Sequence, residues 1–382
     1  MKVEESLGSI CEFVLDGTHG SPVRSDSGIP VLSAQNVRGG ILDFTTDRYT
    51  TEAEYLSFDR RLSLQAGDVL LTIVGTIGRA AVVEEVQPLV FQRSVAILRP
   101  KTALVDSRFL FHTTQSPQFK EQLRRATNTS SQSGVYLGRL KEVVIGLPSL
   151  DEQRRIADIL DKADELRSKR RAALETLETL SQAIFIEMFG DPRSSQFPMR
   201  AIRDLGKVTT GRTPPSAKAN MFDGPVPFIT PGDLDSATGI SAKRSLTEEG
   251  ALNSRIVRKG STFVCCIGAT IGKTGIAQVA SAFNQQINAI EWGDEISDFY
   301  GLFAMKQLRS EIKIRGASTT LPLMNKTDFA ALNLPVPPIS IQEDFEAAMS
   351  GLESSSQNQH ESLFRHEKLF ASLQQKAFQG AL

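Results

Sequence analysis

GDVLLTIVGTIG (residues 67–78) and GSTFVCCIGATIG (residues 260–272) are two versions of one phrase, an apolar strand that enters a loop containing glycine. Three further pairs repeat in the same order: IPVLSAQNVRGG (29–40) with VPFITPGDLDSATG (226–239), FQRSVAILRP (91–100) with FNQQINAIEW (283–292), and residues 124–148 with residues 313–337. The interval between copies is far too long for a solenoid repeat. The chain of 382 residues therefore contains a duplicated unit.

A long helical pattern follows each copy. Residues 151–190 begin after Pro148 and end at Gly190-Asp191-Pro192, and their apolar residues recur every three or four positions. A helix of this length extends about 58 Å and, with such a seam, favours a second helix alongside it. Residues 341–382 supply that helix. We expect antiparallel pairing through Ile156, Ile159, Leu166, Arg170, Leu177, Leu180 and Ile184 of the first helix and Phe345, Leu352, Leu363, Phe370 and Leu373 of the second.

Arg170 is the one interruption in the apolar stripe of the first helix. Antiparallel pairing brings it near Gln359 and His360, in the polar centre of the second helix (SSSQNQH, 354–360). Two interpretations stay open. The polar residues form a layer that fixes the register of the pair, or the centre is loosened and solvated.

The two long segments have a mixed pattern. Short β-branched strands alternate with turns rich in Gly, Pro, Asp and Ser, and one amphipathic helix is predicted in each segment, at residues 106–123 and 297–312. The predicted fold class is therefore α+β, with two similar domains and twisted sheets. The boundaries that follow are a first domain at 1–150, a helix at 151–190, a second domain at 191–340 and a C-terminal helix at 341–382.

The composition is typical of an ordinary soluble globular protein, with 40% hydrophobic residues and a net charge of −1. No apolar run reaches bilayer length, and the N-terminus does not resemble a signal peptide, so we expect a cytoplasmic protein with no membrane partner. Basic residues are concentrated in the long segments and the helical segments are acidic. Binding to a polyanion would therefore be local to the two domains.

GATIGKT (268–274) lacks one residue of the P-loop spacing, because Ile267 stands where the first glycine is needed. Three interpretations remain: a nucleotide-binding loop, a tight turn between strands, or a glycine loop that brings Arg79 or Lys273 close to a nucleic-acid backbone. No catalytic or metal-binding motif is present, and Cys265-Cys266 reads as a pair of packing residues in a strand. The sequence predicts a protein without its own catalytic site, metal or cofactor.

Four stretches carry a resemblance to a known family: LPSLDEQRRIADIL (147–160), IFIEMFGDP (184–192), LPVPPISIQEDF (334–345) and SLQQKAFQGAL (372–382). In this order, they make the whole chain similar to the specificity subunit of type I restriction-modification systems. One departure is Gln342-Glu343-Asp344, which stands where the first helix has Glu152-Gln153-Arg154.

The resemblance implies a DNA-recognition subunit with two target recognition domains, each reading one half of a bipartite site in double-stranded DNA. It also implies that the helices form an antiparallel coiled coil that docks two modification (methyltransferase) subunits, which carry S-adenosylmethionine, and restriction subunits. An alternative from another class is a coiled-coil scaffold whose globular domains bind protein.

Polar and basic residues on the repeated loops are the candidates for DNA contact, since Gln and Asn can pair with adenine and Arg with guanine. They are Gln35, Asn36, Arg38, Arg79, Gln92, Arg93, Arg124, Arg125, Asn128, Ser131 and Tyr136 in the first domain and Arg212, Asp233, Lys273, Asn284, Gln285, Gln286, Arg315, Thr319 and Asn325 in the second. For each of them, an ordinary solvated loop residue is the alternative.

Overall fold

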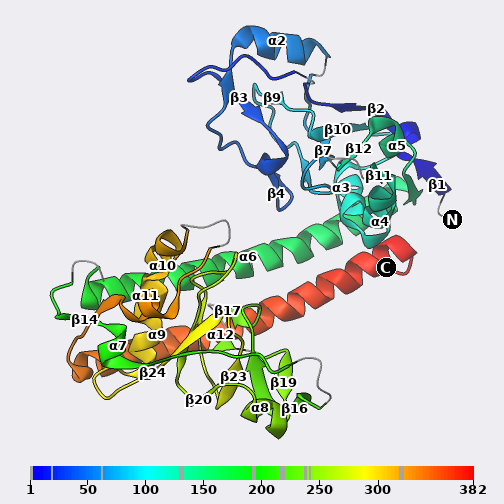
Figure 1. Ribbon diagram of the computed structural model, residues 1–382. Helices are drawn as coiled ribbons and strands as arrows, with labels where there is room; N and C mark the ends of the chain where they lie inside the picture. Colours follow the sequence, from blue (N-terminus) through cyan, green and yellow to red (C-terminus); the bar gives the residue numbers. More distant parts are fainter. Residues whose placement is uncertain are drawn as a thin grey trace. The chain divides into compact units, whose positions relative to one another are not determined.

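The computed structural model describes residues 3–18, 20–61, 63–128, 133–191, 195–215, 220–235, 239–240, 242–317 and 322–382. The chain divides into two compact units, of which unit 1 comprises residues 1–168 and 365–382 and unit 2 comprises residues 169–364. Each unit contains one copy of the repeat and a part of both long helices (Figure 1).

Unit 1 is built around a four-stranded antiparallel sheet in the order β2-β10-β7-β8, and its inner strands are apolar and almost fully buried. A three-stranded sheet, β6-β3-β9, lies beside it in the fold and contains a parallel pair, β3 with β9. The strands are β1 (Val3–Ser6), β2 (Cys11–Asp16), β3 (Ile29–Leu32), β4 (Val37–Arg38), β5 (Ile41–Leu42), β6 (Tyr49–Thr50), β7 (Val69–Thr72), β8 (Ala80–Val82), β9 (Val90–Phe91), β10 (Val95–Pro100), β11 (Thr127–Asn128), β12 (Gly134–Val135) and β13 (Val144–Leu147).

Unit 2 repeats this topology. Its antiparallel sheet has the order β15-β24-β21-β22, and a second sheet, β19-β16-β23-β20, again contains one parallel pair, β16 with β23. The strands are β14 (Met199–Ala201), β15 (Gly206–Thr210), β16 (Phe222–Ile229), β17 (Leu234–Asp235), β18 (Gly239–Ile240), β19 (Arg244–Leu246), β20 (Ile256–Val257), β21 (Thr262–Cys265), β22 (Thr274–Ile276), β23 (Ser281–Phe283), β24 (Ile287–Trp292) and β25 (Asn333–Pro335). The matching strand orders confirm the duplication predicted from the sequence.

The amphipathic helix expected in each domain is in fact two helices, so the prediction of one was wrong. In unit 1 the break falls at Ser116-Pro117: the hydroxyl of Ser116 accepts a hydrogen bond from the N–H of Phe119 (3.2 Å), and Pro117 begins the next helix. The helices within the two domains are α1 (Leu7–Ile10), a 3₁₀ turn η1 (Ala34–Asn36), α2 (Glu52–Arg61), α3 (Ser107–Gln115), α4 (Pro117–Ala126), α5 (Leu137–Lys141), α7 (Ile202–Leu205), α8 (Glu248–Leu252), α9 (Asp298–Gln307), α10 (Arg309–Gly316) and α11 (Lys326–Ala330).

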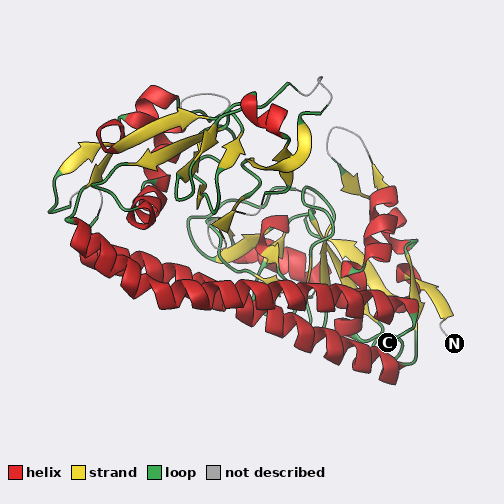
Figure 2. Ribbon diagram, turned by 90° about the horizontal axis from the view of Figure 1, so that it is seen from below, coloured by secondary structure: helices red, strands yellow, loops and turns green. Residues whose placement is uncertain are grey.

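The two long helices, α6 (Leu150–Phe189) and α12 (Ile339–Gln379), are continuous, including the polar centre of α12 (Figure 2). In unit 1 the first part of α6 packs with the last part of α12: Ile156, Leu160 and Ala163 share a core with Phe370 and Ala377. This pairing is antiparallel, because the start of one helix meets the end of the other. Among the described residues, no helix is both long and apolar enough to cross a membrane.

In unit 2 the end of α6 is anchored by aromatic rings. Phe185 stacks on Tyr300 of α9 (5.7 Å between ring centroids) and meets Phe345 of α12 edge-on (5.6 Å). Phe189 contacts the same two rings at 4.8 and 5.2 Å. These four rings are fully buried and join both helices to the second domain.

The expected contact in the helix pair of unit 2 is present. Nη1 of Arg170 donates a 2.8 Å hydrogen bond to Oε1 of Gln359, so the polar centre of α12 takes part in the pairing. Leu166 and Leu180 differ from the prediction, since each is 45% exposed. The buried positions of α6 shift toward Leu160, Phe185 and Phe189, because the helix faces its domain as well as α12.

Two buried glutamines occupy equivalent places where the long helices begin. The side-chain amide of Gln153 donates to the carbonyls of Leu104 and Pro148 (both 2.9 Å) and accepts from the N–H of Asp106 (2.9 Å). Gln342 repeats this arrangement with the carbonyls of Glu295 (2.8 Å) and Pro337 (2.9 Å) and the N–H of Ser297 (2.8 Å). The structure thus matches Gln342 with Gln153, one residue away from the alignment made on sequence, and the supposed departure disappears.

Candidate nucleic-acid interface

In unit 1, three loops and one hairpin meet around Ser94, between β9 and β10. The hydroxyl of Ser94 accepts a hydrogen bond from the N–H of Ala34 (3.1 Å), and its carbonyl accepts one from the N–H of Ile73 (2.9 Å). The carbonyl of Ile73 accepts in turn from the N–H of Val135 in β12 (2.9 Å). Backbone bonds therefore hold the loops after β7 and β9 beside the hairpin β11–β12, and the Ser94 hydroxyl holds the loop after β3 to them.

The two backbone bonds of this junction recur in unit 2, with Gln286 in the place of Ser94. Its carbonyl accepts from the N–H of Cys266 (2.8 Å), and the carbonyl of Cys266 accepts from the N–H of Met324 (2.9 Å). Because the backbone carries these contacts, the side chains on the loops can differ between the units without loss of the junction.

The glycine loops that open the repeat are hairpin turns between antiparallel strands. In unit 1 the N–H of Thr72 donates to the carbonyl of Arg79 (2.8 Å), and in unit 2 the N–H of Cys265 donates to the carbonyl of Lys273 (2.8 Å). Gly78 and Gly272 have φ values of 91° and 83°, which favour glycine. A P-loop leads into a helix, whereas this loop leads into strand β22. The turn interpretation of GATIGKT is therefore confirmed.

A second pair of glycines was missed in the sequence, at the ends of β2 and β15. A Cβ atom on Gly17 would lie 2.2 Å from the carbonyl oxygen of Phe91, and one on Gly211 would lie 2.1 Å from that of Asn284. No side chain fits at these distances, so glycine lets the strand end approach the loop at residues 91–94 or 283–286. The signal available in the sequence was the matching position of the two glycines, each directly after the first strand of its sheet.

Most of the predicted contact residues lie on these loops and are open to solvent. The exposed ones are Gln35, Arg38, Arg79, Arg93, Arg124, Arg125, Asn128, Tyr136, Arg212, Gln285, Arg315 and Asn325, and the half-buried ones are Gln92, Lys273, Asn284 and Gln286. Ser131 and Thr319 lie outside the described residues. Arg315 forms an ion pair with Glu311, and the side chain of Asn325 caps α11 by accepting from the N–H of Asp328 (2.9 Å).

Asn36 and Asp233 are buried and belong to the framework of their loops. Oδ1 of Asn36 accepts from the N–H of Ser33 (3.0 Å), and its amide donates to two carbonyls of the following segment. Oδ2 of Asp233 accepts from the N–H (2.8 Å) and the hydroxyl (2.6 Å) of Thr230. These equivalent residues shape the loops, so the exposed face is formed by their neighbours.

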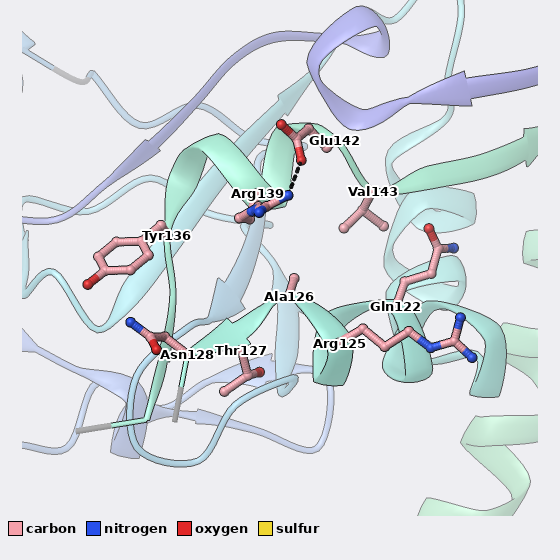
Figure 3. A pocket seen from close by; sticks show the side chains of 9 residues that line it. All are labelled: Gln122, Arg125, Ala126, Thr127, Asn128, Tyr136, Arg139, Glu142 and Val143. Carbon is pink, nitrogen blue, oxygen red and sulfur yellow. Dashed lines mark hydrogen bonds and ion pairs between the residues drawn. The ribbon is translucent and has the colours of Figure 1, made fainter. Parts of the chain in front are cut away.

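A pocket of about 640 Å³ opens in unit 1 beside the hairpin β11–β12 (Figure 3). Three predicted contact residues line it, Arg125, Asn128 and Tyr136, together with Arg139. The nearby Glu121 pairs with both Arg124 and Arg125 (2.8 Å each), and hydrogen bonds from Arg124 and then Arg125 lower its pKa to about 2.

Lys273 has a different setting from its counterpart Arg79. It lines a cavity of about 530 Å³ in unit 2, whose other walls include Lys306 of α9 and residues of α6 and α12. Burial lowers the pKa of Lys306, and burial raises that of Glu353 on α12. The glycine turn therefore presents its cation to the helix pair in unit 2.

The two adjacent cysteines pack on opposite faces of their strand, as expected. Cys266 belongs to the core that contains Phe185 and Phe189, and Cys265 to the core that contains Phe263 and Phe283. Burial raises the pKa of the Cys266 thiol to about 12. Among the described residues, no three His, Cys, Asp or Glu side chains are grouped so that they could hold a metal ion.

Comparison with known proteins gives one consistent result. A family model described as "Type I restriction modification DNA specificity domain" matches residues 4–176 and 195–362, one match for each copy of the repeat. The type I restriction enzyme MjaIX specificity subunit of Methanocaldococcus jannaschii is 22% identical over 338 residues, which cover 83% of this chain and 78% of that protein.

Two further matches agree with it. The EcoBI specificity subunit of Escherichia coli is 26% identical over 174 residues, 44% of this chain and 36% of that protein. Among solved structures, the type I restriction-modification S subunit from M. genitalium has a TM-score of 0.59 at 15% identity and covers 99% of this chain and 96% of its own.

Proposed function

Because the chain belongs to the family of type I restriction-modification DNA specificity domains, we propose that it is the DNA-recognition subunit of a type I restriction-modification complex. It reads a bipartite site in double-stranded DNA, one half with each domain. The observation that carries the proposal is the duplicated junction: in each unit, loops with exposed polar side chains are joined by the same two backbone hydrogen bonds, around Ser94 in unit 1 and around Gln286 in unit 2.

The exposed loop residues supply the two kinds of contact that sequence-specific binding requires. Arg79 and Arg212 are suited to phosphates, which position a protein on DNA, while Arg93 and Gln285 are suited to base edges. Arg93 and Gln285 occupy equivalent places in the two units. This pair favours guanine in one half-site and adenine in the other.

We further propose that the chain itself is not a catalyst and that α6 and α12 dock two modification subunits and the restriction subunits. The curated relatives are named as specificity subunits of restriction enzymes, which supports this division of labour. In the proposed complex, the modification subunits bind S-adenosylmethionine and methylate adenine. The complex acts in the cytoplasm, where the DNA lies.

The test is co-expression of the full chain with a cognate modification subunit in a host without other adenine methylation, followed by genome-wide mapping of methylated adenines. The expected result is one bipartite motif with a fixed gap. Binding of the purified complex to that site should weaken steeply as salt is raised, because counterions are released from the DNA. Absence of new methylation with a partner that is active beside another specificity subunit would refute the proposal.

A further inference from the structure

The 640 Å³ pocket of unit 1 is lined by an aromatic ring and two arginines, a combination that the reading of base edges does not require. Its walls come from α4 and β11 on one side and from α5 and the residue before it on the other (Figure 3). The volume falls within the range of about 300–1,000 Å³ that is typical of sites for small molecules. The pocket therefore has room for a group as large as one nucleotide.

One wall of the pocket is fixed by the fold. The side-chain amide of Gln122 donates to the carbonyl of Val144 (2.8 Å), and its oxygen accepts from the N–H of the same residue (3.0 Å). These two bonds tie α4 to β13. The adjacent Val143 is buried, so this end of the pocket is anchored to the core of unit 1.

Tyr136 lies at the other end of the pocket, next to Asn128 (Figure 3). Its side chain is 67% exposed, and although Tyr136 is the N-cap residue of α5, its hydroxyl makes no capping hydrogen bond. The equivalent N-cap in unit 2, Asn325, does cap its helix. A large aromatic ring left open to water, with no role in the local structure, is typical of a surface that stacks on a base.

Two cations, Arg125 and Arg139, line the same pocket as the ring (Figure 3). The side chains of Arg125 and Arg139 are 73% and 69% exposed, and each pairs within its own segment, with Glu121 (2.8 Å) and Glu142 (3.2 Å). Exposed ion pairs between residues three or four positions apart contribute little to the stability of the fold. Phosphate oxygens can therefore replace these carboxylates at low cost.

From this arrangement we propose that the pocket lined by Tyr136, Arg125 and Arg139 receives one nucleotide of the DNA half-site read by unit 1. Tyr136 stacks on a base that has left the duplex stack, and the two arginines pair with neighbouring phosphates of the same strand. This inference rests on the proposed function and adds a deformation of the DNA at one half-site. Asn128 lies beside the stacked base and is placed to bond its edge.

The experiment uses the full chain in complex with its modification subunits, bound to DNA that contains the methylated motif in unmethylated form. Permanganate, which oxidises unstacked thymines, and hydroxylamine, which attacks unstacked cytosines, map the disturbed base pair on both strands of the unaltered first half-site. The variants are Tyr136→Ala and Tyr136→Phe. We expect a reactive position with the unaltered chain and with Tyr136→Phe, and its loss with Tyr136→Ala together with an affinity lower by about 5- to 100-fold.

Salt dependence tests the arginines separately. Arg125→Gln and Arg139→Gln should each lower the slope of log affinity against log salt by about 0.9, the value of one phosphate contact. Arg60→Gln on α2 is the reference, because Arg60 is exposed, is not among the predicted DNA contacts and does not line the pocket.

Three results would overturn the proposal. They are the absence of an unstacked base in the first half-site, unchanged binding by Tyr136→Ala, and an equal loss of slope for Arg60→Gln and Arg125→Gln. Each can occur while the motif is still methylated by the unaltered complex, so failure of this inference is distinguishable from failure of the proposed function.

Discussion

Replacement of Gln342 by methionine gives a sharp test of how the second long helix is attached to its domain. The substitution keeps the length of the side chain and removes an amide that is fully buried and makes three hydrogen bonds. It leaves the N–H of Ser297 and two carbonyls without a partner. An unsatisfied buried group costs about 1–3 kcal/mol, and carbonyls cost less than N–H groups, so the expected loss is about 3 kcal/mol.

The assay is urea unfolding followed by the fluorescence of Trp292, the single tryptophan of the chain, which is buried in unit 2. The midpoint should fall while the slope of free energy against urea stays the same. Gln357→Met is the control, since Gln357 lies exposed on the same helix within unit 2 and should change the free energy of unfolding by less than about 0.5 kcal/mol. A loss below about 1 kcal/mol for Gln342→Met would refute the reasoning.

Three further outcomes are expected. Burial raises the pKa of Asp161, but hydrogen bonds from His112 and Arg108 lower it to about 2, so its stabilisation is present above about pH 4 and lost as pH falls toward 2. Asp161→Asn should remove that pH dependence and cost about 2 kcal/mol at pH 7, measured by urea unfolding at several pH values. Gly211→Ala should displace the loop at residues 283–286 and, in mapped methylation, degrade one half of the motif only. Gln285→Ala should cost about 1–3 kcal/mol in DNA binding and blur one base position, and unchanged methylation specificity would rule out that contact.

The duplicated architecture was predictable because its signals are local and occur twice. The strands after Gly67 and after Gly260 combine β-branched or apolar runs with a glycine turn, and both fold into the same hairpin. Comparing the copies made a nucleotide site less favoured, because only one copy carries Lys273 and Thr274 after its glycine. The antiparallel pairing of β21 with β22 shows that the loop is a turn between strands.

What escaped prediction depends on contacts between distant residues. The role of Gln153 could not be read from its neighbours, because its partners Leu104 and Asp106 lie in the preceding domain. The break at Ser116 was legible, yet the apolar pattern continues across it and suggested one helix. Asn36 looked like a contact residue because its type suits adenine, whereas its burial follows from the turn that it closes.

The contacts that attach each domain to the long helices have the same backbone arrangement in the two units but different side chains. In unit 1, Asp161 of α6 binds His112 (2.7 Å) and Arg108 (2.7 Å) of α3. In unit 2 the corresponding helix α9 presents Phe299 and Phe303, which pack on Phe345 of α12. The backbone arrangement is the same although the chemistry differs.

The exposed loops likewise keep the same backbone arrangement in both units while their side chains differ. The hydrogen bonds around Ser94 and Gln286 are made mainly by backbone atoms. Unit 1 can therefore have Arg93 and Tyr136 where unit 2 has Gln285 and Asn325, with the same backbone arrangement of the loops. A protein that reads two different half-sites needs this separation, because each domain must change its contacts while keeping its position. The backbone hydrogen bonds of the junction keep the loops in the same position in both units, and the exposed side chains on those loops determine which bases are contacted.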